Sequence, residues 1–332
     1  MATKEVLADQ PNFISSLYIQ YYDKPEPMKI LYGLIICFFT ISTSVVQISL
    51  SLNLIQGREY RQVMNGKIAM TQNFNGQEIN VKMVIKGNIV YLVKSVNATS
   101  FDMDVKYESV GMEMQLPQGT MKFSSENPSE QDVFSQVLAG MINKPFQLQI
   151  AKNGKINFVK NIESLFTAAF EKFTQLSEAQ KEQIKSQLLQ TYGDKAFANN
   201  IEMSTAIFPD KPVTIGETWV VETKIETAMA ANIRTTYKFI EDKPEYRQIH
   251  GDAVITSANK GEYTMTNGME MKFDVQGSMV SDIKVDRTTG WILEANIVQN
   301  LTGNAHIKGN DQMPEGMTMP MTIKTEILNT GN

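Results

Sequence analysis

The side chains that most often catalyse reactions or bind metal ions are scarce in this sequence. It contains two histidines, His250 and His306, and one cysteine, Cys37. A nucleophile–base pair therefore has few candidate bases, and no Gly-x-Ser-x-Gly, P-loop or His-Glu-x-x-His motif occurs. Because every position after Cys37 lacks a thiol, disulfide frameworks and cysteine-based zinc sites are excluded there. These counts predict a protein that is not an enzyme and has no cofactor.

Two pairs of aspartates have a spacing that acid–base catalysis uses, but their sequence context favours another interpretation. Asp102 and Asp104, like Asp282 and Asp286, lie in runs where polar and apolar residues alternate. Such alternation places the polar residues on the solvated face of a strand. Asp102 and Asp104 are also spaced like the start of a calcium loop, but no glycine bend with a terminal glutamate follows. We therefore predict solvated strand faces at both pairs.

Methionine is the unusual component of the composition. The chain has 20 methionines, and all except Met1 and Met28 lie after residue 44. Thioethers suit Cu(I), which makes the segment 313–321 (MPEGMTMPM) an alternative copper site. No histidine or cysteine lies in this segment, and the alternation of Met317, Met319 and Met321 is typical of one buried strand face. We favour burial and predict no metal site.

The N-terminal region has the pattern of an export signal. Residues 30–41 are apolar, Met28-Lys29 precede them, and Ser42-Thr43-Ser44 provides a small-x-small cleavage site. We therefore predict a cleaved signal peptide at 28–46 and a periplasmic or cell-surface protein, with an uncleaved anchor as the alternative. Residues 1–27 are net negative, unlike a signal leader, and are predicted to be an artefactual leader. Ile36 precedes Cys37, so the cysteine does not fit a lipidation motif.

Strand patterns dominate the rest of the chain, and several short segments recur. Period-two alternation marks 79–85, 101–108, 233–239 and 283–285 as half-buried antiparallel strands. GMEM at 111–114 recurs at 268–271, QGTM at 118–121 resembles QGSM at 276–279, and GREY at 57–60 resembles GETW at 216–219. The similar offsets predict a tandem duplication. Asn153-Gly154 and Thr289-Gly290 also correspond, at a shorter offset that implies an insertion in the first copy.

Helical periodicity predicts three helices, at 130–142 with Ser129 as its cap, at 162–173, and at 178–191 with a Ser177-x-x-Gln180 capping box. The prolines of 208–212 mark a boundary. The sequence therefore predicts a mainly β fold with inserted helices, built from two tandem related curved antiparallel sheets. The predicted segments are a first β-rich repeat at 47–160, a helical connector at 161–207 and a second β-rich repeat at 208–332.

Two segments carry a resemblance to known proteins. LNLIQGREY at 52–60 and FPDKPVTIGETW at 208–219 resemble a family of exported envelope proteins of unknown function, found largely in Bacteroidetes-type bacteria. The likeness covers most of 47–328, implies a periplasmic or surface location, and implies no catalytic residues. A looser likeness, of fold alone, is to the curved half-barrels of lipoprotein carriers and related lipid-binding envelope proteins.

Function is predicted by exclusion and by the distribution of apolar residues. The net charge of −5 provides no basic surface for nucleic acid. Methionines gather in corresponding regions of the two copies, where they line a ligand cavity or fill an irregular core. We predict binding of a lipid or other apolar ligand in a cup of sheet and helices, with the predicted helices covering its mouth. The alternative is a structural or protein-interaction module of the envelope, with a solid core, an envelope protein partner and no small ligand. The predicted lining residues are Phe134, Leu138, Phe166, Phe170, Met112, Met114, Met269 and Met271.

Overall fold

The computed structural model describes residues 46–332 apart from 75, 130, 226–228, 259–260, 267–268 and 310–313, and apart from the side chains of 187, 190 and 191. The chain divides into one unit of residues 1–44 and a second of residues 45–332. The predicted artefactual leader, nearly all of the predicted signal peptide, and Cys37 lie outside the described residues. Every described strand and helix belongs to the second unit.

The thirteen strands of the described residues form one open antiparallel sheet in the order β6-β5-β3-β2-β1-β13-β12-β11-β9-β8-β7, with β4 on β3 and β10 on β11. The first half supplies β1 (Glu59–Phe74), β2 (Gln77–Val96), β3 (Ser100–Leu116), β4 (Gly119–Ser124), β5 (Phe146–Ala151) and β6 (Ile156–Lys160). The second half supplies β7 (Thr218–Ile225), β8 (Ala231–Asp242), β9 (Tyr246–Ser257), β10 (Thr264–Thr266), β11 (Met269–Asp286), β12 (Ile292–Ile307) and β13 (Met317–Gly331).

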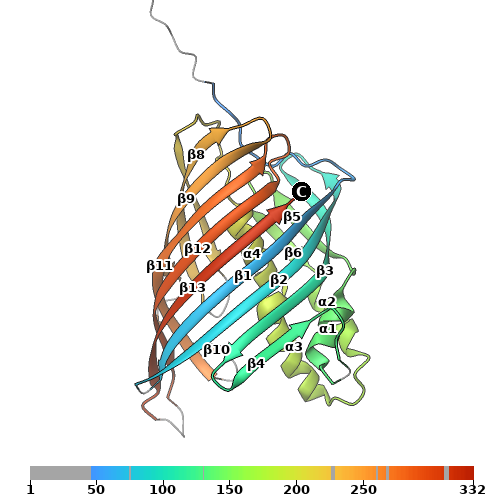
Figure 1. Ribbon diagram of the computed structural model, residues 1–332, viewed down its shortest axis with the longest axis vertical. Coiled ribbons are helices and arrows are strands. Elements are labelled where there is room, and N and C mark those ends of the chain that lie inside the picture. The colour runs from blue at the N-terminus through green and yellow to red at the C-terminus, as the bar shows by residue number, and fades with distance from the viewer. Residues whose placement is uncertain are drawn as a thin grey trace, which may run out of the picture. The chain divides into compact units, whose positions relative to one another are not determined.

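The prediction of a mainly β fold with inserted helices is confirmed, but the prediction of two tandem sheets is wrong. In Figure 1 the blue strand β1 lies beside the red strand β13. Their register runs from Gln62 opposite Gly331 to Gln72 opposite Met321. Both strands have one apolar face, and pairing them satisfies backbone groups that two separate sheets would leave at open edges. The two halves therefore share one sheet.

Four helices occur among the described residues: α1 (Val133–Met141), α2 (Ile162–Phe170), α3 (Glu178–Tyr192) and α4 (Asp194–Thr205). The first three match the predicted helices, whereas α4 was not predicted. The cap of α1 is Asp132, whose carboxylate accepts from the Ser135 N–H, so the prediction of Ser129 as the cap is wrong. No helix in the described part of the chain is long and apolar enough to cross a membrane.

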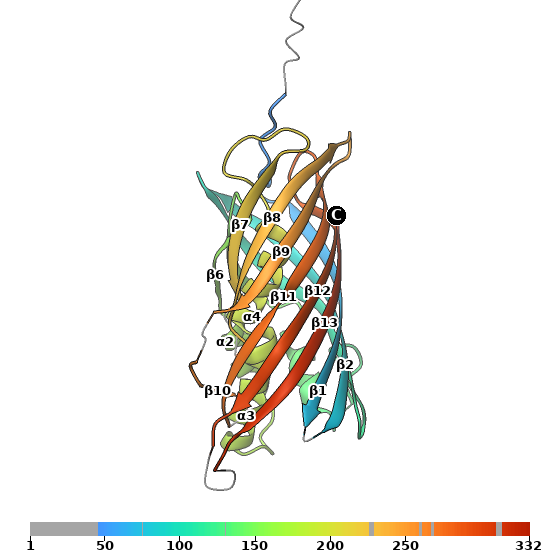
Figure 2. The same cartoon turned by 90° about the vertical axis from the view of Figure 1, so that its left-hand side faces the viewer.

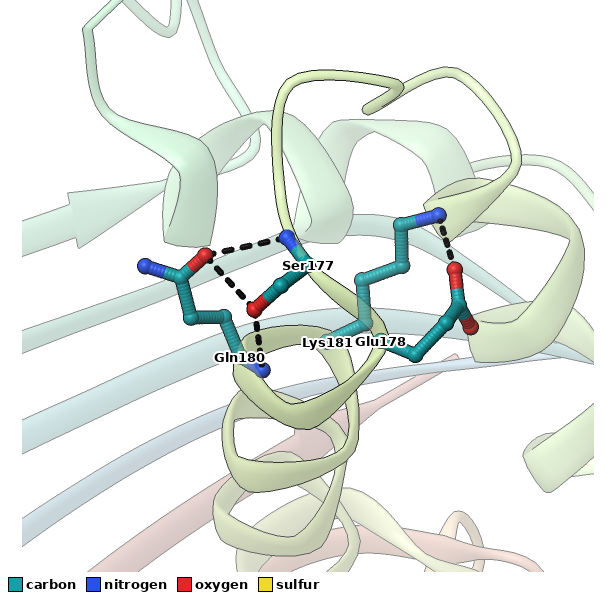
Figure 3. A network of polar contacts seen from close by, with 4 residues as sticks. All are labelled: Ser177, Glu178, Gln180 and Lys181. Atoms are coloured by element: carbon teal, nitrogen blue, oxygen red, sulfur yellow. Dashed lines mark hydrogen bonds and ion pairs between the residues drawn. The ribbon is translucent and has the colours of Figure 1, made fainter.

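The predicted capping box at the start of α3 is present (Figure 3). The Ser177 hydroxyl accepts from the Gln180 N–H at 3.3 Å, and the Gln180 side-chain oxygen accepts from the Ser177 N–H at 3.0 Å. Ser177→Ala is expected to lower the free energy of unfolding by about 1 kcal/mol, because the Gln180 N–H of the first turn loses the hydroxyl that accepts its hydrogen bond. Urea denaturation measures the change. Ser186→Ala, at an exposed position within the same helix, is the control, and an equal loss in both variants would contradict the capping role.

The helices pack against one face of the sheet, which curves around them (Figures 1 and 2). Side chains of alternating strand residues point to this concave face. In β3 they are Phe101, Met103, Val105 and Tyr107, all buried. Phe197 of α4 makes edge-on ring contacts with Tyr107 and with Phe146 of β5, at 5.9 and 4.9 Å between centroids. These contacts fix α4 against one flank of the concave face.

Some of the repeated sequence segments occupy equivalent places in the two halves of the fold, and others do not. Gly57 and Gly216 both precede the first strand of their half, and both have a positive φ. Gly154 and Gly290 also correspond, in the β5–β6 and β11–β12 turns. In contrast, residues 111–114 lie near the end of β3, whereas Met269 begins β11. The duplication and the domain boundaries based on it stay predictions.

The two predicted aspartate pairs lie on the convex face of the sheet, since they alternate with buried residues of β3 and β11. Asp102 accepts hydrogen bonds from Ser95, Gln149 and Asn97, which lower the pKa of its carboxyl. Asp286 accepts from the N–H groups of Thr288 and Thr289, and these bonds lower the pKa of its carboxyl although burial opposes them. Both carboxylates are thus held by neighbouring donors of loops and strands.

His250 lies between two carboxylates on the convex face, at 2.8 Å from Asp282 and 3.3 Å from Asp252. The hydrogen bond to Asp282 raises the pKa of the imidazole. A histidine with a raised pKa stabilises the fold fully below its unfolded pKa of about 6.5, and that stabilisation is lost as pH rises through the folded value. The stability difference between wild type and His250→Gln is therefore expected to shrink from pH 5.5 to pH 9, as measured by urea denaturation. A stability difference that stays constant over this pH range would contradict the stabilising role of the protonated His250.

Candidate functional site: a cavity on the concave face

A cavity of about 380 Å³ lies between the concave face of the sheet and helix α4. Its sheet wall comes from β1, β2 and β13, with single contributions from β7 and β12 and two from β3. Its helical wall comes from α4 and the last residue of α3. Cavities of roughly 300–1,000 Å³ with mainly apolar walls are typical of sites for small molecules. The apolar side chains that form the wall include Met64, Ile68, Met83, Ile85, Ile327, Phe197, Ile201 and Met203.

Strand register explains why these side chains meet. Gly66 of β1 lies opposite Ile85 of β2 on one side and Ile327 of β13 on the other. Ile68 is two residues further along β1 and lies opposite Met83. Because side chains alternate between faces, all of these positions point to the concave side. A Cβ atom on Gly66 would meet nothing nearer than the Ile85 carbonyl oxygen, at 3.9 Å, so the glycine leaves space in the wall.

Three polar side chains border the same cavity. The Tyr192 hydroxyl, Asn199 Nδ2 and Gln299 Nε2 are buried and have no hydrogen-bond partner within the described residues. A buried polar group without a partner costs about 1–3 kcal/mol. Burial raises the pKa of Tyr192 to about 12, so its hydroxyl keeps its proton at neutral pH. The cavity therefore combines an apolar wall with three unpaired polar groups.

A methionine-rich cluster continues the apolar surface beyond the cavity. It consists of Met271, Val275, Ala305, Ile307 and Met321, with Met70, Met229, Phe273, Met317, Met319 and Ile323 packed against it. Met70 follows the cavity residue Ile68 on the same face of β1, and it pairs with Ile323 of β13. Met70 and Ile323 are only half-buried. The concave face thus presents partly exposed apolar side chains that lead from the cavity to this cluster.

Met317, Met319 and Met321 share one face of β13, as predicted, and the predicted burial holds in full for Met321. Met321 is buried, and Met317 and Met319 are half-buried within the methionine-rich cluster. Met313 lies outside the described residues. Among the described residues no group of three or more histidine, cysteine, aspartate or glutamate side chains is arranged to hold a metal ion.

The four predicted helix residues do not line this cavity. Leu138 of α1 and Phe166 and Phe170 of α2 are buried in the main hydrophobic core. Phe134 is half-buried and its ring packs at a tilt against that of Phe123, with 4.6 Å between ring centroids. Helical periodicity identifies a buried face, but it does not show whether that face meets protein or open space. A ligand contact at these four residues stays a prediction.

The four predicted methionines lie at the ends of strands, also outside the cavity. Met112 is buried and Met114 half-buried, and both point to the concave side because they pair with the cavity residues Ile85 and Met83. Met271 belongs to the methionine-rich cluster, whereas Met269 is 41% exposed. Their role in ligand binding stays a prediction.

Sequence reasoning missed the three polar residues of the cavity. Gln299 was recognisable in principle, because Ile297, Gln299 and Leu301 share the concave face and glutamine interrupts an otherwise apolar stripe. Tyr192 and Asn199 lacked such a signal. Tyr192 is the last residue of α3, and Asn199 lies in α4, which was not predicted.

Comparisons with known proteins give a family and no activity. No curated protein matches the sequence. Among solved structures, lipovitellin is similar at 10% identity and a TM-score of 0.45, over 84% of this chain and 25% of that chain. An outer membrane channel from Pseudomonas putida F1 is similar at 6% identity and a TM-score of 0.25, over 85% of this chain and 99% of that chain. The chain thus spans a quarter of lipovitellin, and TM-scores this low support no argument about function.

The sequence of residues 98–292 matches a family of unknown function, DUF6263. The matched range is more than half of the chain and extends from two residues before β3 to the first residue of β12. It includes Tyr192 and Asn199 but not Gln299. The predicted resemblance to a family of unknown function is confirmed, and this chain belongs to the DUF6263 family.

Proposed function

We propose that this protein binds a lipid or another elongated apolar molecule on the concave face of its sheet, without catalysing a reaction. The observation that supports the proposal is the cavity beside α4, whose apolar wall continues into half-buried methionine and isoleucine side chains. Apolar side chains that face unfilled space lose dispersion contacts, and an apolar guest restores them. Methionine is suited to such a wall, since its flexible side chain adapts to different guests.

Native mass spectrometry of the full chain, purified from a bacterial host without added lipid, tests the proposal. We expect a population with additional mass that disappears after organic extraction and whose extract contains acyl chains. The extracted protein should then take up a fluorescent fatty acid or phospholipid at micromolar concentration. A mass equal to that of the chain alone, together with no uptake of either probe, would refute the proposal.

The second candidate function is a protein-interaction module. Apolar side chains are exposed on the convex face, where Val280 of β11 pairs with Val298 of β12 and Val254 of β9 is 62% exposed. Exposed apolar groups on a sheet surface are typical of contact sites for partners. Crosslinking in the native cell tests whether the protein contacts a protein partner. This second function requires no small ligand.

We further propose a location in the cell envelope, which is supported by the apolar segment 30–41 and its small-x-small continuation. Fractionation of the native cell, with an antibody against the described unit, tests it. We expect the protein in the periplasmic or membrane fractions, shortened by the length of the signal. Recovery of a full-length chain in the cytoplasmic fraction would contradict export.

A further inference from the structure

The unpaired polar groups of the cavity carry information about its ligand. Tyr192 and Gln299 are 6% and 9% exposed, so bulk water does not satisfy the hydroxyl and the amide. Asn199 contributes a third unpaired atom from α4. Hydroxyl and amide side chains both donate and accept hydrogen bonds. A purely hydrocarbon ligand would leave all three groups unpaired, so the cavity suits a ligand that brings oxygen atoms.

The charge of the cavity restricts which oxygen-bearing group fits. Among the described lining residues, Lys86 is the one with a charged side chain. Lys86 is exposed and occupies the convex-side position between Ile85 and Gly87, so its ammonium group is directed away from the cavity. An anionic headgroup beside Tyr192 and Gln299 would therefore be buried without a counter-charge, which is strongly unfavourable. An uncharged carbonyl has no such penalty.

We infer that the ligand is an uncharged acyl ester. This inference rests on the proposed function. The two ester oxygens accept hydrogen bonds from the side chains of Gln299, Asn199 and Tyr192, while the acyl chain lies along the apolar wall formed by β1, β2 and β13.

Three radiolabelled probes with the same twelve-carbon chain separate the possibilities: methyl dodecanoate, dodecanoate and dodecane. Equilibrium binding to the delipidated full chain at pH 8 gives the three affinities. We expect the methyl ester to bind at least tenfold more tightly than either of the others. Tighter or equal binding of dodecanoate would overturn the inference but leave the proposed function intact. Equal binding of dodecane and the ester would also overturn it. Binding of none of the three would contradict the proposed function itself.

The double variant Gln299→Leu, Tyr192→Phe tests which residues are responsible. It replaces unpaired polar groups with apolar groups of similar size. We expect a loss of at least tenfold in affinity for methyl dodecanoate, unchanged affinity for dodecane, and a higher Tm of the ligand-free protein. A double variant that binds the ester like the wild type would overturn the assignment. Gln183→Leu, at an exposed position of α3 that does not line the cavity, is the matched control and should leave the ester affinity unchanged.

Discussion

Replacing Gly154 with alanine is expected to lower the free energy of unfolding by about 4 kcal/mol or more, among the largest effects of single substitutions. Gly154 lies in the β5–β6 turn with a φ of +86°, where a side chain is strained. A Cβ atom there would overlap the backbone oxygen of Thr205, at the end of α4. The Thr205 hydroxyl also donates to the Gly154 carbonyl oxygen at 2.7 Å. The alanine would therefore separate α4 from the turn.

Gly76→Ala is the matched control for backbone strain. Gly76 has nearly the same φ, +84°, but a Cβ atom there would meet nothing within 4 Å. Strain alone costs about 1–2 kcal/mol. Guanidinium denaturation measures the loss in free energy of unfolding for both variants. The larger loss expected for Gly154→Ala is the effect of the contact with Thr205. Equal losses in the two variants would show that the close approach of α4 to the turn does not matter for stability.

Gly66→Leu is expected to reduce the affinity for an acyl ligand at least tenfold without destabilising the protein. The leucine side chain would extend from the concave face of β1 into the cavity, where nothing lies within 3.9 Å of its Cβ position. Glycine within a strand is itself unfavourable by about 0.5–1 kcal/mol relative to alanine, so the replacement is expected to raise Tm slightly. Ligand uptake and thermal unfolding, measured on the same preparation, separate the two effects.

Gly111→Leu is the control for this experiment. Gly111 of β3 pairs with Lys86 on the convex side, and its Cβ position makes an ordinary contact at 3.6 Å with the Phe123 carbonyl oxygen. The same chemical change on the opposite face should leave ligand uptake unchanged. Equal uptake by the Gly66→Leu variant and the wild type would exclude the cavity as the binding site.

Local sequence patterns predicted most elements, because the signals that define them lie within a few residues. The alternation in β3 and β8 and the Ser177 capping box are of this kind. Helix α4 was missed since its sequence, DKAFANNIEMST, combines two adjacent asparagines with buried Ser204 and Thr205, which weakens its apolar stripe. Its burial depends on contacts with distant strands, such as those of Phe197.

The single sheet and the cavity could not be predicted for a related reason. The pairing of β1 with β13 joins residues more than 200 positions apart, and the alternation within either strand does not specify its neighbour. A cavity is a volume where side chains are missing. Gly66 and Ile68 therefore have the same sequence pattern whether the opposite side is filled by helix or open to a ligand.

The pairing of β1 with β13 also has a consequence for the order of folding. Ribosomes deliver β1 early and β13 late, so β1 cannot acquire its second neighbour until nearly all of the described chain has been made. Contacts between such distant segments form slowly because a long loop must close first. The nascent chain is thus expected to remain incompletely folded during synthesis, with its native sheet completed only once β13 has been made and has left the ribosome. Such a delay is compatible with the export proposed above, since a chain that has not yet folded still passes through a narrow translocation channel.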